Sequence, residues 1–275
     1  MLTTKTAAPL WLEPGLRRVL APNPSPMTAE GTNTYLLGEG KVALIDPGPA
    51  LPAHARAIRE ALSPNERISH VLVTHAHLDH SPLARELADT WGLPVLGFGP
   101  PDAGRSPRMV ALAADSEAGG GEGVDRDFLP DQRLADGDRI EGAGWALDVL
   151  HTPGHFAGHL CFAWGDRLFS GDHVMGWAPS LVSPPDGDMA AYMASLHRLA
   201  QIAFARAYPG HGTPIDNPTA RIAALIAHRK ARETAILAAL DIGQQTLASI
   251  TAHAYEGTPP ALLPAASRNA FAHLI

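Results

Sequence analysis

The sequence predicts a layered α/β domain followed by a short run of helices. Strand-like and helix-like segments alternate up to about residue 217, which is the order expected of an α/β domain. The run at 68–74 is short, apolar and β-branched, as in a buried strand. From Thr219 onward the pattern is helical, with few strand signals. We therefore expect one domain over residues 1–218 and a helical extension over residues 219–275.

The elements of the α/β domain follow from local patterns. Two short strands over 34–46 are joined by a Gly-Glu-Gly turn. Apolar residues at helical spacing predict helices over 52–63 and 81–91. Gly, Pro, Ser and Asp predict a surface loop over 99–127 and a Pro-rich loop over 178–188. The remaining predicted strands are 94–98, 145–152, 159–164, 166–172 and 204–210, and the remaining predicted helix of this domain is 189–202.

The extension is predicted to contain three helices. Residues 220–240 form a long, alanine-rich and amphipathic stretch. Two shorter helical stretches follow at 244–255 and 261–275. The apolar face of the first helix is expected to pack on the α/β domain or on a partner.

Length and composition bound the class of protein. The chain has 275 residues, of which 45% are apolar and 18% charged, so it can bury a sizeable core. The net charge of −7 disfavours non-specific binding of nucleic acid but leaves a local basic patch open. The single cysteine, Cys161, excludes an intramolecular disulfide and is expected to be a core residue.

The N-terminal 20 residues show no targeting signal. Charged residues such as Lys5, Glu13 and Arg17 interrupt any apolar run of signal-peptide length. No stretch reaches the roughly 20 apolar residues that a membrane helix needs. We therefore expect a cytoplasmic enzyme that does not associate with a membrane.

The most informative stretch is His75-Ala76-His77-Leu78-Asp79-His80. It lies where a predicted buried strand ends and a helix begins, which is a usual place for site residues in an α/β fold. Three imidazoles buried together without a metal would be desolvated with few partners. Neutral imidazole is a common metal ligand, and a carboxylate offsets the charge of a cation. The stretch therefore predicts a metal site.

Three further segments place a candidate ligand where a strand meets a loop. His155 follows Pro153 and Gly154, Asp172 follows Gly171, and His211 lies between two glycines. With the first stretch they provide five histidines and two aspartates. This set is large enough for two metal sites that share a bridging carboxylate.

The motif His-x-His-x-Asp-His, followed by a lone His, a lone Asp and a lone His, resembles that of the metallo-β-lactamase superfamily over about residues 30–217. The resemblance implies an αββα sandwich of two mixed sheets with helices outside. It also implies two divalent metal ions, with Zn(II) expected and Mn(II) or Fe(II) as alternatives. The implied ligands of the first metal are His75, His77 and His155; those of the second are Asp79, His80 and His211, with Asp172 bridging both.

The implied chemistry is hydrolysis by a water or hydroxide that the metals activate. Asp79 is expected both to bind the second metal and to orient this nucleophile. His159 and His173 are candidate proton donors to the leaving group, with a structural role as the alternative for each. Asp46 resembles a family aspartate that supports the ligand loops, and its alternative role is to cap a turn.

Residues next to the predicted ligands indicate which reactions of the family are expected of this chain. β-Lactam-cleaving members typically lack a bridging aspartate, so Asp172 argues against a β-lactamase. Glyoxalase II enzymes share all seven ligands, but Glu-Tyr typically follows their last histidine, where this chain has Gly212. The segments 31–36, 208–212 and 228–233 are instead similar to the beta-lactamase-like protein 2 group, whose characterised members cleave single-stranded RNA and carry a winged-helix-like domain after the hydrolase core.

Three hypotheses about function follow. The first is phosphodiester cleavage of the endoribonuclease kind, with single-stranded RNA as substrate. The second is thioester or ester hydrolysis of a small molecule, including glyoxalase-II-like or lactone-opening activity. The third is that Arg229, Lys230 and Arg232 form a binding face for nucleic acid or protein, against the alternative of a solvated helix face. The extension over 219–275 resembles an abbreviated winged-helix-like domain, and the sequence predicts no oligomeric state.

Overall fold

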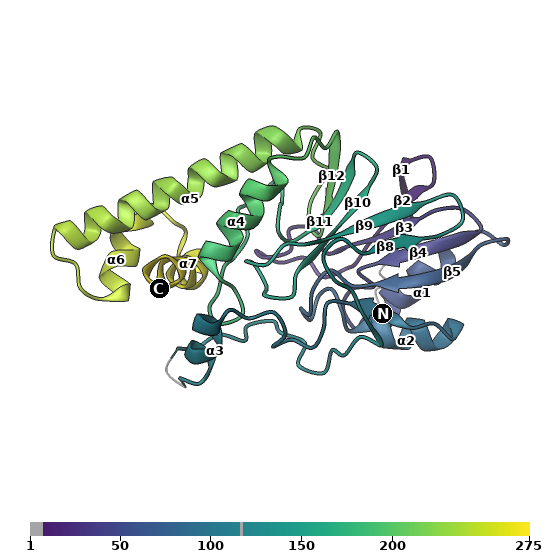
Figure 1. Ribbon diagram of the computed structural model, residues 1–275, viewed down its shortest axis with the longest axis horizontal. Helices are drawn as coiled ribbons and strands as arrows, with labels where there is room; N and C mark the ends of the chain where they lie inside the picture. Colours follow the sequence, from purple (N-terminus) through teal and green to yellow (C-terminus); the bar gives the residue numbers. More distant parts are fainter. Residues whose placement is uncertain (1–7, 116–117) are drawn as a thin grey trace, which may run out of the picture.

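A computed structural model describes residues 8–115 and 118–275 of the chain (Figure 1). Two sheets lie face to face, one of seven strands in the order β1 to β7 and one of five in the order β12-β11-β10-β9-β8. The strands are β1 Leu10–Glu13, β2 Leu16–Leu20, β3 Asn33–Leu37, β4 Lys41–Ile45, β5 Arg67–Leu72, β6 Val95–Gly97, β7 Gln132–Arg133, β8 Arg139–Glu141, β9 Ala146–His151, β10 Leu160–Trp164, β11 Arg167–Gly171 and β12 Arg206–Pro209.

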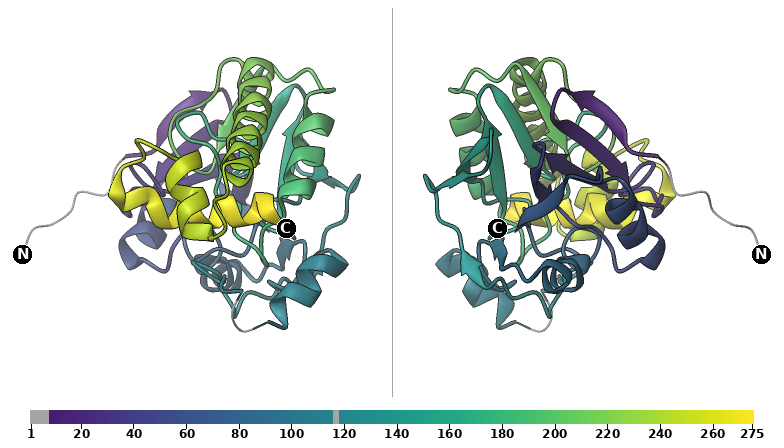
Figure 2. Two further views of the ribbon diagram at one scale, coloured as in Figure 1. Left: turned by 90° about the vertical axis from the view of Figure 1, so that its left-hand side faces the viewer. Right: turned by 90° about the vertical axis from the view of Figure 1, so that its right-hand side faces the viewer.

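The helices cover the outer faces of the two sheets and extend beyond them (Figures 1 and 2). Both sheets mix parallel and antiparallel pairs. Two mixed sheets with helices outside confirm the αββα sandwich that the family resemblance implied. The helices are α1 Pro52–Glu60, α2 Leu83–Trp91, α3 Pro107–Ala113, α4 Met189–Leu199, α5 Pro218–Asp241, α6 Leu247–Ala254 and α7 Leu263–Leu274, with a 3-10 turn at Pro260–Leu262.

Alternation of side chains along each strand divides the core into layers. In β3, Tyr35 and Leu37 point between the two sheets, whereas Leu36 points outward beneath α1 and α2. On the far side of the second sheet, Leu168 joins a cluster with residues of α4 and α5. Cys161 belongs to this cluster and is fully buried, which confirms it as a core residue.

The structure corrects the prediction that residues 99–127 form only a loop. Helix α3 lies inside this segment, with Pro107 in its first turn. The Ser106 side chain caps the helix by accepting from the Met109 backbone N–H. A serine cap followed by proline is a helix start signal. The many Gly, Pro, Ser and Asp residues around it predict a loop instead, so the helix was not expected. Strands β1, β2, β7 and β8 were also missed, because they are short and carry several charged residues.

The C-terminal helices form a layer of their own that is joined to the sandwich (Figure 2). Helix α5 begins at Pro218, after Asn217 caps it by accepting from the Ala220 N–H. Its first half packs on the sandwich through Ile222 and Leu225. Its second half forms a separate apolar cluster with α6 and α7, through residues such as Ile236. In the described part of the chain, no helix is both long and apolar enough to cross a membrane.

A buried ion pair ties the first sheet to the end of α1. The Arg17 guanidinium donates to both carboxylate oxygens of Glu66, at 2.7 and 3.0 Å, and to the carbonyl oxygen of Ala61 at 2.8 Å. The two side chains are only 1% and 7% exposed. Burial raises the pKa of Glu66, but the hydrogen bonds from Arg17 outweigh it and leave this pKa below its ordinary value of 4.5.

Glu66→Gln is expected to lower the free energy of unfolding by about 3 kcal/mol at neutral pH, because it leaves the Arg17 charge buried without a counter-ion. Since the folded state depresses the pKa of Glu66, its contribution is present above pH 4.5 and is lost as the pH falls through the folded value. Urea denaturation should therefore show the variant and the wild type converging in acid.

The control is Glu86→Gln, which breaks the exposed pair between Arg59 and Glu86. It is expected to cost less than about 1 kcal/mol at any pH. An equal loss of stability in the two variants would contradict the role given to the Arg17–Glu66 pair.

Candidate metal centre

The seven predicted ligands come from four loops at one edge of the sandwich. β5 ends at Leu72 and leads into the loop that carries His75, His77, Asp79 and His80. This loop is fixed by its backbone, because His77 pairs with Val124 and the Leu78 N–H donates to Gly123.

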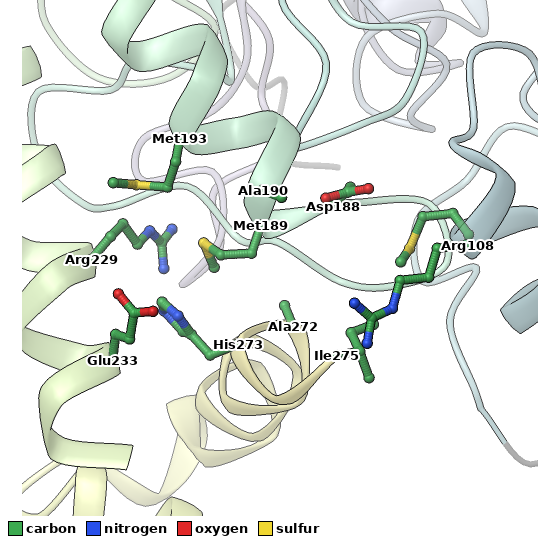
Figure 3. A pocket seen from close by; sticks show the side chains of 11 residues that line it. Arg108, Asp188, Met189, Ala190, Met193, Arg229, Glu233, Ala272, His273 and Ile275 are labelled. Carbon is green, nitrogen blue, oxygen red and sulfur yellow. The ribbon is translucent and has the colours of Figure 1, made fainter. Parts of the chain in front are cut away.

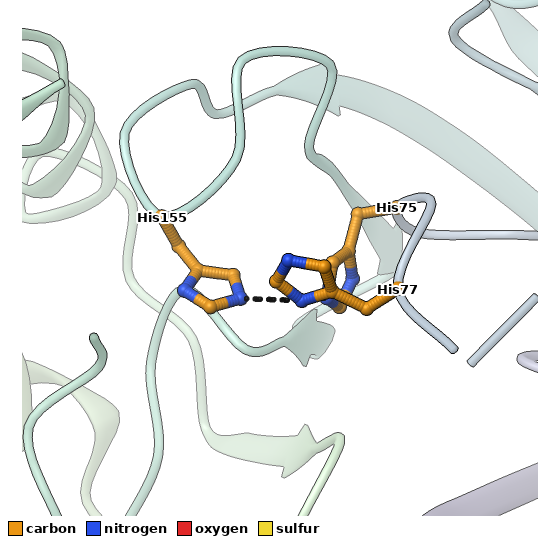
Figure 4. Close-up of side chains that lie close together, drawn as sticks. All are labelled: His75, His77 and His155. Atoms are coloured by element: carbon orange, nitrogen blue, oxygen red, sulfur yellow. Dashed lines mark hydrogen bonds between the residues drawn. The ribbon is translucent and has the colours of Figure 1, made fainter. Parts of the chain in front are cut away.

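One group of nitrogens comes from His75, His77 and His155 (Figure 4). His77 Nδ1 lies 2.9 Å from His75 Nε2 and 3.2 Å from His155 Nε2. The three ligand atoms lie within 4.8 Å of one another. Such a spacing lets three imidazole lone pairs meet at one point, as a tetrahedral metal site requires.

The second group consists of Asp79, His80 and His211. His211 Nε2 lies 3.3 Å from His80 Nε2 and 3.1 Å from the Asp79 carboxylate. The Asp172 carboxylate reaches both groups: it lies 3.3 Å from His211 Nε2, 3.5 Å from His80 Nε2 and 3.8 Å from His155 Nε2. The structure thus brings all seven predicted ligands together and places Asp172 between the two groups.

Two glycines make this approach possible. A Cβ atom on Gly210 would lie 2.3 Å from Asp172 Oδ1 and 2.6 Å from the His80 ring. A Cβ on Gly171, whose φ is +46°, would lie 2.6 Å from His159 Nε2. Gly210 is therefore required by the close packing of the ligands, and Gly171 by the close packing of His159 against the start of the segment that carries Asp172.

Electrostatics differ between the two groups. Burial, with a smaller contribution from the neighbouring His155, lowers the pKa of His77 to about 3. Burial and the nearby histidines also hold the pKa of His75 well below its ordinary value. These rings are neutral at neutral pH, so their nitrogen lone pairs are free to bind a cation.

In the second group, the charges of the carboxylates outweigh burial and raise the pKa values of the histidines. Burial would lower the pKa of His211, but the Asp172 carboxylate raises it to about 9. For His80, the charges of Asp79 and Asp172 outweigh burial and raise the pKa well above its ordinary value. Burial would raise the pKa of Asp172, yet the charges of His211 and His80 hold it well below its usual range. The carboxylates are thus ionised and strongly attract positive charge.

Asp46 supports the ligand loop from the end of β4. Its carboxylate accepts from His80 Nδ1 at 2.9 Å, from the Thr74 backbone N–H at 2.7 Å and from the Thr74 hydroxyl at 2.8 Å. Its φ of +50° is unusual for a residue other than glycine. Asp46 therefore does more than cap a turn: it fixes one ring and the backbone that leads to the motif.

Other ligand rings are held by groups that the sequence did not single out. His155 Nδ1 donates to the Leu181 carbonyl at 2.6 Å, and His211 Nδ1 donates to the Gly31 carbonyl at 3.2 Å. His75 Nδ1 lies 2.9 Å from the Thr74 hydroxyl. Such partners fix the ring orientation and tautomer of metal-binding histidines. Thr74 adjoins the motif and could have been found; the backbone carbonyls carry no sequence signal.

The two candidate proton donors are both fully buried. His159 Nδ1 lies 2.9 Å from the Thr152 hydroxyl, and its Nε2 accepts from the Asp172 N–H at 3.2 Å. His173 packs against the Tyr192 ring at 4.7 Å, and burial lowers its pKa to about 3. These positions favour the structural alternative for both, since neither ring reaches the solvent from which a leaving group would approach.

The residues present suit a pair of divalent metal ions. Five imidazoles and two carboxylates are the ligand types that Zn(II) and similar ions take. The Asp172 Oδ1 atom is buried and has no hydrogen-bond partner among the described residues. Since an orphaned buried carboxylate oxygen is costly, a cation at this position satisfies a specific need of the structure.

Two exposed apolar side chains lie close to predicted ligands. Leu78 lies between two of the predicted ligands and is 53% exposed. Trp177 is 44% exposed and contacts Gly212, the neighbour of His211. Exposed apolar groups beside a polar site mark a surface that can bind an apolar part of a substrate.

Similarity to known proteins is consistent with this geometry. A profile of the metallo-beta-lactamase superfamily matches residues 27–211. The lactamase-like protein adaB of Aspergillus niger is 36% identical over 82% of this chain, and the chain spans 63% of that relative's length. The beta-lactamase-like protein 2 homolog of Caenorhabditis elegans is 31% identical over 94% of this chain and 82% of its own. The thioesterase pkgB of Emericella nidulans is 34% identical over 81% of this chain and 58% of its own.

Solved structures also resemble the chain. The metallo-beta-lactamase family protein TTHA1429 from Thermus thermophilus has a TM-score of 0.74 and 29% identity, covering 96% of this chain and 93% of that one. TTHA1623, solved in a di-iron-bound form, has a TM-score of 0.54 and 30% identity, covering 72% of this chain and 93% of its own.

Asp46→Asn is expected to weaken metal binding by about 10- to 100-fold, the usual cost of losing a group that orients a ligand. Asparagine tolerates the positive φ but cannot accept all three hydrogen bonds with one amide oxygen. Competition with a chromophoric chelator measures the affinity. Asp138→Asn, which alters a carboxylate that accepts from the Ala135 N–H in an exposed loop, should bind metal like the wild type. Equal affinities in the two variants would refute the role of Asp46.

Proposed function

Because the chain belongs to the metallo-beta-lactamase superfamily, we propose that it is a metal-dependent hydrolase with a binuclear site. The convergence of two ligand groups on the Asp172 carboxylate carries this proposal. The proposed ligands are His75, His77, Asp79, His80, His155, Asp172 and His211.

When bound, two divalent ions would lower the pKa of a water molecule and polarise the bond that is cleaved. The protein's part is to hold the ligands in fixed orientations and to keep their lone pairs free. Asp79 is 27% exposed, so its carboxylate can reach both a metal and the solvent. We assign to Asp79 the orientation of the attacking water.

For the substrate class we propose thioester or ester hydrolysis of a small molecule with an apolar part. The exposed Leu78 and Trp177 beside the site support an apolar ligand. The relative named a thioesterase supports the same class. Two of the three charges predicted to form a basic face are engaged within the protein: Arg229 is only 2% exposed, and Arg232 donates to the Ala254 carbonyl. The predicted basic face is therefore reduced to Lys230.

Phosphodiester cleavage is the second candidate. It is favoured by one observation: the beta-lactamase-like protein 2 homolog aligns over 94% of this chain, so its match includes most of the C-terminal helices, whereas the lactamase-like relative aligns over 82%. The two candidates differ in the leaving group and in the charge of the substrate, so direct assays separate them.

Asp172→Ala is expected to reduce the metal content from two ions per chain to one or fewer and to abolish hydrolysis, while the circular dichroism spectrum stays native. The carboxylate lies between both ligand groups, so neither site keeps its charge balance without it. Elemental analysis of the purified protein measures the content and identifies the metal. A control is Asp216→Ala, at an exposed aspartate paired with Arg206. A fully loaded, active Asp172→Ala protein would overturn the site.

The substrate class is tested with S-lactoylglutathione, a longer acyl thioester, bis(p-nitrophenyl) phosphate and a single-stranded RNA oligonucleotide. Thioester turnover should be lost on chelation and restored by metal. Trp177→Ala should raise KM for the longer thioester about tenfold, because burial of a large apolar side chain stabilises by roughly 1.5–3 kcal/mol. Trp11→Ala, an exposed tryptophan of β1, is the control. Cleavage of RNA without thioester turnover would select the phosphodiesterase candidate.

A further inference from the structure

The loop between β11 and α4 separates the metal centre from the C-terminal helices. Its residues 180–182 are buried or half-buried and contact both sides. On the outer side lies a cavity of about 290 Å³ between α3, α4, α5 and α7, lined by Met189, Met193, Arg229 and His273 among others (Figure 3). Arg229 extends from α5 into this space.

On the inner side, the loop touches two of the predicted ligand segments. The Leu181 carbonyl accepts from His155 Nδ1 at 2.6 Å. The Ser180 hydroxyl donates to the carbonyl of Asp172 and lies 3.1 Å from the carbonyl of His173. Two adjacent residues of the loop therefore hold the ring of one ligand and the backbone of another.

On the outer side, the same residues are bound by the C-terminal helices. Arg229 donates through one terminal nitrogen to the Ser180 carbonyl and through the other to Asn269 Oδ1, at 3.0 Å. Asn269 Oδ1 also accepts from the Val182 N–H at 3.1 Å. The residues on either side of Leu181 are thus tied to α5 and α7 by Arg229 and Asn269.

The environment of Arg229 indicates that this side chain holds neighbouring groups in place. Its side chain is almost completely buried, and both acceptors of its guanidinium are neutral oxygens. Its guanidinium carbon lies 5.0 Å from the centre of the Tyr192 ring, and the Tyr192 hydroxyl donates to the His173 carbonyl at 3.1 Å. A buried charge with neutral acceptors is expensive in stability, but it fixes the geometry of the groups that it binds.

We propose that Arg229 is a positioning residue of the metal centre. It fixes residues 180–182 and, through them, the orientation of the His155 ring and the backbone of Asp172. The inference rests on the proposed metal site. It also gives the C-terminal helices a role in metal binding, since Arg229 and Asn269 both belong to them.

Arg232 provides a matched comparison one turn along α5. Its guanidinium also lies over a tyrosine ring, at 4.5 Å from the centre of Tyr255. It also donates to a backbone carbonyl, that of Ala254 at the end of α6. The two arginines therefore make the same kinds of contact, but only Arg229 contacts the loop that holds the ligands.

The test compares Arg229→Met with Arg232→Met in the full-length protein. Each is measured for zinc affinity by competition with a chromophoric chelator, and for the melting temperature of the metal-free protein. We expect Arg229→Met to weaken binding of at least one zinc ion about tenfold, the lower end of the effect of groups that orient ligands. Arg232→Met should leave zinc affinity unchanged, even where it lowers the melting temperature.

Two further variants guard against a general loss of folding. Arg229→Lys keeps one donor for the Ser180 carbonyl and should recover part of the zinc affinity. Asn269→Ala removes the acceptor of the Val182 N–H and should also weaken zinc binding. Hydrogen exchange at residues 180–182 should be faster in Arg229→Met than in Arg232→Met.

Zinc affinities that match the wild type in folded Arg229→Met overturn the inference, as does an equal loss in Arg229→Met and Arg232→Met. Failure of the proposed function has a different signature, because the wild-type protein itself would then bind no zinc.

Discussion

The structure is organised around one buried carboxylate, that of Asp172, which needs compensating charge and neighbours held at fixed distances. Asp172 lies within 3.5 Å of both His80 and His211, and its side chain is only 9% exposed. An ionised group in such a position needs compensating charge, and one of its oxygens has no hydrogen-bond partner among the described residues. The proposed metal ions supply that charge, and the surrounding loops keep the ligands from separating.

The sandwich brings the ligands together because the strands that lead to them end at the same edge. β5 and β11 deliver the ligand motif and Asp172 from different sheets, and the inter-sheet core fixes the distance between them. Glycines at 171 and 210 permit contacts that any side chain would block. Asp46 then holds His80 from β4. The geometry therefore depends on close packing around the ligands as much as on the ligands themselves.

The C-terminal helices take part in the same arrangement. Helix α5 begins on the sandwich and ends in its own apolar cluster, so it links the two. Arg229, which the sequence placed in a basic surface cluster, is instead buried against residues 180–182. The helical pattern of α5 was easy to predict, but the face on which Arg229 lies is covered by segments far away in the chain.

Local patterns along the chain were enough to predict an α/β domain, most of its strands and helices, and seven candidate ligands, because strand periodicity, the clustered motif and residues at strand ends are local features. The sandwich of two sheets and the division of the ligands between two metals came from the resemblance to a known family. Local patterns did not show which groups support the ligands. The Leu181 carbonyl and the Ser180 hydroxyl act through distances that only the packed chain creates. The burial of His159 and His173 likewise depends on packing, because a histidine next to a ligand can point toward solvent or into the core. The local sequence pattern determines which segments form strands and helices and in what order they follow one another. Long-range packing determines which side chains are buried and what they contact.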